Sequence, residues 1–283
     1  MGGGVLLFQQ ILMIVLITGA SSGIGLSAAK RLASQGHKVY GAARRVELME
    51  GIPGVVPVRL DLTSEASVAE AVKFVLQAEG RIDALVNNAG YGSLGPVETV
   101  PMEEARRQMD VNLFGLAAMV KAVLPLMREQ GFGRIVNVSS IAGRVVMPMC
   151  AWYNVSKYSV EALSDNLRMD LRRFGIRVSL IEPGGIRTPW GDIAATHLED
   201  SVRDTAYEEA GLREARVLRK GYSMRVLSSP EVVARAICRA VNSRHPRARY
   251  RVGAGSRLII TLHTLLPTRW WDSLCRSFMS LKV

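Results

Sequence analysis

Residues 13–25 read MIVLITGASSGIG, and this stretch decides the fold class. Its first five residues form a continuous apolar run, which is typical of a parallel strand buried on both faces. Small residues follow, and the apolar spacing after Gly25 predicts a helix from Leu26 to about Ala33. A strand, a glycine-rich turn and a helix in this order favour a turn that holds a phosphate at the helix N-terminus. A purely structural turn is the alternative.

Similar apolar runs recur along the chain. They are Val39–Ala42, Val55–Leu60, Ala84–Val86, Ile135–Val138 and Val178–Ile181, and a longer segment with helical spacing follows each. This alternation predicts an α/β fold with a doubly wound, Rossmann-like and mostly parallel sheet covered by helices on both faces. Because no repeat or Pro/Gly-rich linker interrupts it, we expect a single domain at residues 13–255.

Three segments depart from this alternation. Residues 1–12 read as an N-terminal extension, since the apolar run Val5–Ile17 is shorter than the ~20 residues of a membrane span. Residues 190–224 are polar and charged, and we expect mobile helices that form a lid over a substrate. Residues 256–283 form an amphipathic tail with two tryptophans and several basic residues. A peripheral membrane helix and a segment packed on the domain or a partner subunit are both open interpretations.

Composition narrows the function classes. Of 283 residues, 48% are hydrophobic and 22% charged, which excludes a disordered or fibrous chain. The three cysteines, Cys150, Cys238 and Cys275, are too scattered for a zinc site or a disulfide framework, so we expect no metal and a cytoplasmic location. The net charge of +11 could favour nucleic acid, an anionic membrane or a phosphorylated ligand. No nucleic-acid-binding motif accompanies it, so we expect no nucleic acid partner.

The end of the second predicted strand indicates the cofactor. In dinucleotide-binding folds an acidic residue there binds the ribose hydroxyl of NAD, whereas arginine accommodates the 2′-phosphate of NADP. Here Ala43 occupies the acidic position, and Arg44 and Arg45 follow it. Guanidinium groups pair bidentately with phosphate, so the sequence predicts NADP(H). The alternative is that both arginines merely solvate a surface turn.

Tyr153 and Lys157 lie at i and i+4 in a predicted helix from about Trp152 to Arg173, and therefore on one face. A free phenol has a pKa of about 10, and lowering it to about 7 requires roughly 4 kcal/mol. A unit charge about 4 Å away supplies that much at an effective dielectric near 20. Lys157 is therefore sufficient in magnitude to make Tyr153 an acid–base group, although this spacing alone is common by chance.

Polar groups follow the ends of the other predicted strands. Ser139 and Ser140 come after the fifth, residues 87–90 read NNAG after the fourth, and residues 183–188 read PGGIRT after the sixth. Asn112 lies in a predicted long helix from about Glu103 to Met127. Each alone also fits a turn or a cap. Together, at the strand ends where open α/β sheets bind ligands, they indicate an active site.

These motifs resemble the short-chain dehydrogenase/reductase family, in its single-domain branch, over nearly all of Leu12–Val252. The form TGxxxGxG at residues 18–25 is typical of that family. The resemblance implies that Tyr153 is the general acid/base and that Lys157 holds the nicotinamide ribose and lowers the tyrosine pKa. Ser140 precedes Tyr153 by the family's usual 13 residues, with Ser139 as the alternative serine. Asn112 would fix a water in the proton relay.

The resemblance also implies a cofactor site, with Asp61 and Leu62 on the adenine side. Its expected members are Gly19, Ser21, Ser22, Gly23, Ile24, Gly25, Arg44, Arg45, Asp61, Leu62, Asn88, Ala89, Gly90, Val111, Tyr153, Lys157, Pro183, Gly184, Ile186 and Thr188. In this family the long helices that carry Asn112 and Tyr153 usually form a subunit interface, so we expect a homodimer or homotetramer.

Apolar and partly flexible side chains surround the expected substrate position. They are Tyr91, Val145, Met147, Met149, Cys150, Trp152, Trp190 and Ile193. Unless they are simply core, they favour a lipophilic ketone, steroid, retinoid or acyl substrate, and the sequence is similar to family members that act on hydroxysteroids or retinols. The predicted function is hydride transfer between NADP(H) and a carbonyl or secondary alcohol. A catalytically silent NADP(H) sensor or scaffold is the alternative, and an epimerase or dehydratase of the extended branch is disfavoured.

Overall fold

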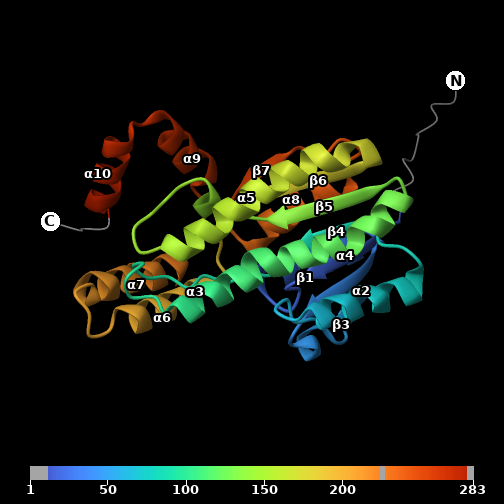
Figure 1. Ribbon diagram of the computed structural model, residues 1–283, viewed down its shortest axis with the longest axis horizontal. Helices are drawn as coiled ribbons and strands as arrows, with labels where there is room; N and C mark the ends of the chain where they lie inside the picture. The colour runs from blue at the N-terminus through green and yellow to red at the C-terminus, as the bar shows by residue number, and fades with distance from the viewer. Residues whose placement is uncertain (1–11, 224–226, 279–283) are drawn as a thin grey trace, which may run out of the picture.

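The computed structural model describes residues 12–223 and 227–278, and β1 (Ile14–Thr18) is an interior strand of its sheet (Figure 1). The other strands are β2 (Lys38–Ala43), β3 (Val55–Arg59), β4 (Ala84–Asn87), β5 (Gly133–Val138), β6 (Ile176–Pro183) and β7 (Arg249–Val252). Within the described residues these seven pair in the order β3-β2-β1-β4-β5-β6-β7, with every pair parallel. The predicted doubly wound fold is confirmed.

Alternate residues of β1 enter two separate cores, which explains its continuous apolar run. Val15 and Ile17 pack under α1 (Gly23–Ser34) and α8 (Pro230–Asn242) on one face. Ile14 and Leu16 pack on the other face, which is covered by α2 (Glu65–Glu79), α4 (Gly115–Glu129) and α5 (Ala151–Leu171). Both faces are therefore shielded from water, as the strand–helix alternation predicts.

The order of the strands places the ligand site. The chain builds outward from β1 in one direction to β3, and then in the other direction from β4 to β7. In open parallel sheets, ligands bind at the carboxyl ends of the strands where this direction changes. The ends of β1 and β4 meet at that point, followed by the ends of β5 and β6.

The long predicted helix is present with an irregular turn in it. It consists of α3 (Met102–Met109), a π-helical turn (Asp110–Phe114) and α4. It is the one helix among the described residues that is long and apolar enough to cross a membrane. Residues of α4 such as Met119 and Val123 are buried in the core against the sheet.

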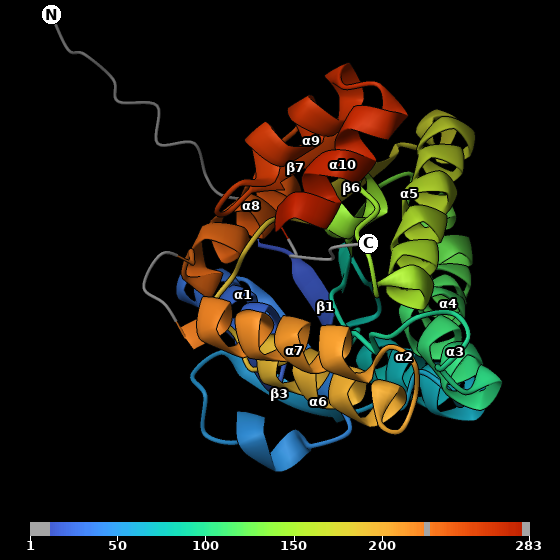
Figure 2. The ribbon, with the colours of Figure 1, turned by 90° about the vertical axis from the view of Figure 1, so that its left-hand side faces the viewer.

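Helices beyond β6 flank the carboxyl edge of the sheet on two sides (Figure 2). The predicted lid forms α6 (Trp190–Val202) and α7 (Glu208–Ser223), and the tail forms α9 (Ser256–Leu265) and α10 (Thr268–Phe278). Whether the lid moves stays a prediction. Of the predicted extension, only Leu12 lies within the described residues.

Candidate active site

The glycine-rich turn after β1 approaches its neighbours too closely for any other residue. Gly19 has φ +68°, and a Cβ on it would lie 2.8 Å from Ala89 Cα. A Cβ on Gly25 would lie 2.3 Å from the carbonyl oxygen of Gly19. The turn therefore depends on glycine both for its left-handed conformation and for the contact of α1 with the strand.

Side chains from β1 and the end of β4 hold this turn in place. Thr18 Oγ1 accepts hydrogen bonds from the backbone N–H groups of Asn88 and Ala89, each at 3.1 Å. Asn88 Nδ2 donates to the carbonyl oxygens of Thr18 at 3.1 Å and Gly19 at 3.3 Å. The side-chain amide of Asn88 thus positions the turn, and the contribution of Thr18 was missed in the sequence.

The start of α1 suits an anion. Ser22 is the N-cap residue, its side chain makes no capping hydrogen bond, and the first turn contains no acidic residue. The unpaired N–H groups and the helix dipole together favour phosphate here. A Cβ on Gly23 would lie 3.4 Å from Thr188 Cγ2, so the turn and the loop after β6 line one space. The predicted residues Ser21, Ser22, Gly23 and Ile24 all belong to this segment.

Positive side chains surround the adenosine end of the expected site. Arg44 and Arg45 follow β2 and are exposed. Two hydrogen bonds from Thr63 lower the pKa of Asp61, and the nearby guanidinium groups of Arg44 and Arg107 lower it further. Arg44 and Arg107 therefore act on the same carboxylate. Arg107 was missed because it lies 63 positions beyond Arg44, in the helix α3 (Met102–Met109).

The remaining predicted cofactor residues lie at the same edge of the sheet. Leu62 packs against α4, where a Cβ on Gly115 would lie 2.6 Å from Leu62 Cβ. Val111 is half-buried in the π-helical turn.

The predicted residues after β6 begin with Pro183, which ends that strand. The N–H of Gly184 donates to Val252 O at 2.8 Å. Ile186 packs into the core beneath α8, so only its backbone can face a ligand.

Tyr153 lies in the first turn of α5 and is almost fully buried. Burial raises the pKa of Tyr153 to about 12, while a hydrogen bond with the Ser140 side chain opposes this shift. Without a cofactor, the phenol is therefore protonated at neutral pH. That state can donate a proton to a substrate oxygen.

Lys157 lies one helical turn further on and faces the same space. Its Nζ donates to Val138 O at 3.1 Å and lies 5.9 Å from the centre of the Tyr153 ring. Burial lowers the pKa of Lys157 to about 8, and the negative charge of Glu161 opposes this shift. The side chain thus remains mostly cationic near neutral pH, beside the phenol.

The structure separates the two serines after β5. Ser140 caps the short turn Ile141–Gly143, accepting a hydrogen bond from Ala142 N at 3.1 Å, and also contacts the phenol of Tyr153. Ser139 is buried beside Glu161, and its Oγ makes no hydrogen bond within the described structure. The geometry therefore favours Ser140 over Ser139 as the serine at the reaction site.

Asn112 is held by backbone and side-chain partners. Its Nδ2 donates to Tyr91 O at 2.9 Å and Ser156 Oγ at 3.1 Å, and its Oδ1 accepts from Tyr91 N at 3.0 Å. A Cβ on Gly90 would lie 3.0 Å from Asn112 Oδ1 and 3.6 Å from Lys157 Nζ. The asparagine is thus close to Lys157, with its amide already engaged. Asn112 itself lies in the π-helical turn, a feature frequent at functional sites.

The expected substrate residues do not all lie together. Met149, Cys150 and Trp190 gather with Tyr153 against α6 in one apolar cluster. Trp190 lies between Tyr153 and Tyr222, with ring centres 5.1 and 5.6 Å away. Val145 instead packs with the tail.

The other expected substrate residues lie outside these two clusters. Met147 and Ile193 are exposed, and the Tyr91 hydroxyl donates to Glu104 Oε1 at 2.9 Å. Trp152 is partly buried, and its Nε1 has no partner in the described structure. Burial raises the pKa of the Cys150 thiol to about 12, which makes it a poor nucleophile.

Sequence reasoning missed a second positioning amide, Asn154. Its Nδ2 donates to Ala142 O at 2.7 Å and Val145 O at 2.8 Å, which fixes the loop that follows Ser140. The one available signal was a polar residue between Tyr153 and Lys157 on a buried helix. Among the residues that the structure describes, no group of three or more His, Cys, Asp or Glu could hold a metal.

Comparison with known proteins gives extensive matches. A family profile described as short chain dehydrogenase matches residues 13–197. A probable short-chain type dehydrogenase/reductase, VdlC, of Helicobacter pylori is 36% identical over 265 residues, covering 93% of this chain and 96% of that protein. The 3-ketodihydrosphingosine reductase of Bacteroides thetaiotaomicron is 38% identical over 240 residues, covering 85% and 87%. Human retinol dehydrogenase 5 is 33% identical over 281 residues, covering 92% and 86%.

Solved structures agree with these matches. A short-chain dehydrogenase from Streptomyces avermitilis superposes with a TM-score of 0.79 at 29% identity, covering 94% of this chain and 99% of that one. A Burkholderia phymatum short-chain dehydrogenase/reductase in complex with NAD has a TM-score of 0.73 at 29% identity, covering 86% and 90%. A serine dehydrogenase complexed with NADP⁺ has a TM-score of 0.73 at 30% identity, covering 85% and 94%.

Proposed function

Because this chain belongs to the short-chain dehydrogenase/reductase family, we propose that it transfers a hydride between NADP(H) and a carbonyl or secondary alcohol carbon of a lipophilic substrate. One observation supports this most strongly. Tyr153, Ser140 and Lys157 converge at the carboxyl edge of the sheet, beside a turn that only glycine allows. Family membership supports oxidoreductase chemistry with a nicotinamide cofactor, whereas the choice of NADP(H), the substrate and the residue roles are our proposals.

The glycine-rich turn and the N-terminus of α1 would hold the pyrophosphate, and Arg44 the 2′-phosphate. When bound, the nicotinamide supplies or accepts the hydride and, in its oxidised form, adds a positive charge. Ser140 would hydrogen-bond the substrate oxygen, and Tyr153 would give that oxygen its proton. Asn112 would hold a water that returns the proton through Lys157.

The electrostatics favour reduction as the working direction. Lowering the Tyr153 pKa from about 12 to about 7 would require roughly 7 kcal/mol. The Lys157 ammonium, 5.9 Å from the ring centre, supplies about 3 kcal/mol at an effective dielectric near 20. The phenol therefore stays protonated until further positive charge arrives, and a protonated phenol is the acid that carbonyl reduction needs.

The apolar cluster around Trp190 supports a lipophilic substrate, as do the names of the sphingosine-type reductase and the retinol dehydrogenase among the relatives. The test is consumption of NADPH over a series of ketones of increasing alkyl length. Each buried CH₂ is worth about 0.8 kcal/mol, so kcat/KM should rise roughly fourfold per methylene until the pocket is filled. Higher kcat/KM for short, hydrophilic ketones would contradict a lipophilic site.

A catalytically silent sensor on the same fold is the second candidate. The approach of the Ser140 side chain to the Tyr153 phenol argues against it, since binding of a cofactor alone needs no such pair. NADPH binding without turnover of any ketone or aldehyde in the series would favour the sensor. We place the enzyme in the cytoplasm, where its three free cysteines would stay reduced.

A further inference from the structure

The tail helix α9 has apolar residues on two faces. Ile260 is 1% exposed and packs with Ile259 and Leu266 against Val145 and Ile141 of the domain. Leu258, Leu262 and Leu265 recur at i, i+4 and i+7 on a different face, and they are 64%, 36% and 74% exposed. A helix with this pattern has a second apolar stripe that the described domain does not cover.

The helix α10 repeats this arrangement. Trp271 is buried, its Nε1 donates to Val146 O at 3.2 Å, and Cys275 lies beside it in the same cluster. Trp270 and Leu274, one turn apart, are 68% and 46% exposed. One side of α10 therefore anchors the tail to the domain, while the other presents an aromatic and an aliphatic side chain to solvent.

Positive charge surrounds these exposed apolar residues. Arg257, Arg269 and Arg276 are all exposed, and Asp272 is the single acidic residue in α9 and α10. Tryptophan and leucine bordered by arginine are typical of helices that lie in the interface of an anionic bilayer.

The tail also lies next to the reaction site. The loop that Trp271 contacts runs from Ser140 to α5, and Val146 and Met147 on it are 53% and 37% exposed. In Figure 2, α9 and α10 lie on one side of the carboxyl edge of the sheet and α6 and α7 on the other. A surface held by α9 and α10 would therefore lie close to the loop that carries Ser140.

We propose that α9 and α10 form a docking surface for an anionic phospholipid bilayer. The surface consists of Leu258, Leu262, Leu265, Trp270 and Leu274, bordered by Arg257, Arg269 and Arg276. One face of the tail packs on the domain, and the other enters the lipid interface. Only the purpose of docking, access to a lipophilic substrate, rests on the proposed function.

The experiment is sedimentation of the full chain with vesicles of phosphatidylcholine, with or without phosphatidylglycerol. We expect binding to the anionic vesicles that weakens with salt. The double variant Arg269→Gln/Arg276→Gln should bind about 30-fold more weakly, at roughly fivefold per basic residue. Trp270→Ser/Leu274→Ser should lose binding to the anionic vesicles. The control Leu212→Ser/Val217→Ser removes exposed apolar side chains from α7 and should bind normally.

Three outcomes would overturn the proposal: no binding of the wild type to anionic vesicles, equal binding by the Trp270/Leu274 variant, or equal losses in the α7 control. Light scattering of the same variants tests whether a second copy of the chain covers this surface instead of a bilayer. A lower oligomer mass for Trp270→Ser/Leu274→Ser alone would show that it does. Activity on a water-soluble ketone separates the two proposals. If the protein is active but does not bind vesicles, only the docking proposal is refuted. If it binds vesicles but is inactive, only the proposed enzymatic function is refuted.

Discussion

Lys157 is a buried cation whose position opposes folding. Its folded pKa of about 8 lies below the ordinary 10.5, so the unfolded state binds the proton more tightly. Stability is then lost as pH falls from about 10.5 to about 8, and the full penalty of roughly 3 kcal/mol applies below that range. We infer that the ammonium serves the proposed proton transfer at the expense of stability.

Lys157→Met should therefore stabilise the cofactor-free protein near neutral pH. The lost hydrogen bond to Val138 O offsets about 1 kcal/mol, which leaves a gain of about 2 kcal/mol, while turnover falls roughly 10²–10⁴-fold. Denaturant unfolding measured at neutral pH and again near pH 10 checks this. The gain should shrink at the higher pH, and a variant less stable at both would show that the ammonium is not the destabilising group.

Arg44→Asp tests the cofactor assignment at a single side chain. A charge-assisted hydrogen bond contributes about 1.5–3 kcal/mol, so the ratio of kcat/KM for NADPH to that for NADH should fall roughly 10–100-fold. Arg235→Asp, on the exposed side of α8, makes the same charge change away from the site. Equal ratios in both variants would mean that Arg44 merely solvates its turn.

For single residues, the sequence predicted which side chains could carry the proposed chemistry, but not which groups those side chains hydrogen-bond. Tyr153 and Lys157 were identifiable because a phenol needs a cation one helical turn away. Asn88 is expected to line the adenosine side and Asn112 to fix a water, and the structure adds that their side chains hold the backbone of Thr18, Gly19 and Tyr91. Those partners are distant in sequence, so no local pattern reveals them.

Among the elements, the position of α6 depends on a close contact between Gly92 and Trp190, which a larger residue at position 92 would not allow. A Cβ on Gly92 would lie 2.4 Å from the Trp190 ring, and Trp190 begins α6 beside Tyr153. Gly92→Ala should push the indole away from the phenol and raise KM for the ketone roughly tenfold, an effect within the 1–3 kcal/mol expected of overpacking. The dissociation constant for NADPH should stay unchanged.

The matched control is Gly221→Ala on α7. Nothing lies within 4 Å of a Cβ there, so this alanine should leave KM as in the wild type. Steady-state kinetics and NADPH titration of both variants provide the measurement. If Gly92→Ala behaves like the control, then Trp190 does not shape the substrate site.

Apolar periodicity predicted six strands, the long helices and the helical insert, with boundaries within a few residues. It missed β7, because Arg249 and Arg251 interrupt the apolar pattern. These arginines pair with the fully buried Glu182 of β6, at 3.1 and 3.0 Å. A strand stabilised by such pairs has no hydrophobic signature, since its partner charge lies 67 or more positions away.

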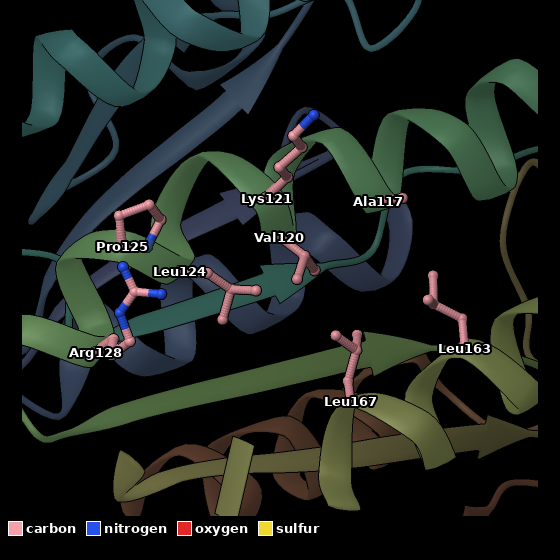
Figure 3. A pocket seen from close by; sticks show the side chains of 8 residues that line it. All are labelled: Ala117, Val120, Lys121, Leu124, Pro125, Arg128, Leu163 and Leu167. Atoms are coloured by element: carbon pink, nitrogen blue, oxygen red, sulfur yellow. The ribbon is translucent and has the colours of Figure 1, made fainter. Parts of the chain in front are cut away.

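For the whole molecule, an apolar groove between α4 and α5 is the surface that matches the expected subunit interface (Figure 3). It is lined by Ala117, Val120, Lys121, Leu124, Pro125, Arg128, Leu163 and Leu167. We propose that this face pairs two copies. Leu124→Arg/Leu163→Arg should weaken the dimer at least 30-fold, as loss of an interface hot spot does.

Light scattering of the eluting protein measures this directly, with Leu212→Arg on α7 as the control. The double variant should elute at the monomer mass with unchanged helical circular dichroism. A wild type at monomer mass, or a variant that keeps the oligomer, would contradict the interface.

The packing of α9 and α10 on the Ser140 loop could not be predicted from the sequence, because an amphipathic tail fits several surfaces equally well.

The most direct test of the proposed chemistry is the rate of hydride transfer in a single turnover, with NADPH already bound, for the wild type and Tyr153→Phe. The phenylalanine keeps the ring against Trp190 and removes the proton donor. We expect the rate to fall roughly 10²–10⁴-fold, with a dissociation constant for NADPH within about twofold of the wild type. An unchanged hydride-transfer rate in Tyr153→Phe would contradict the assignment of this phenol as the proton donor.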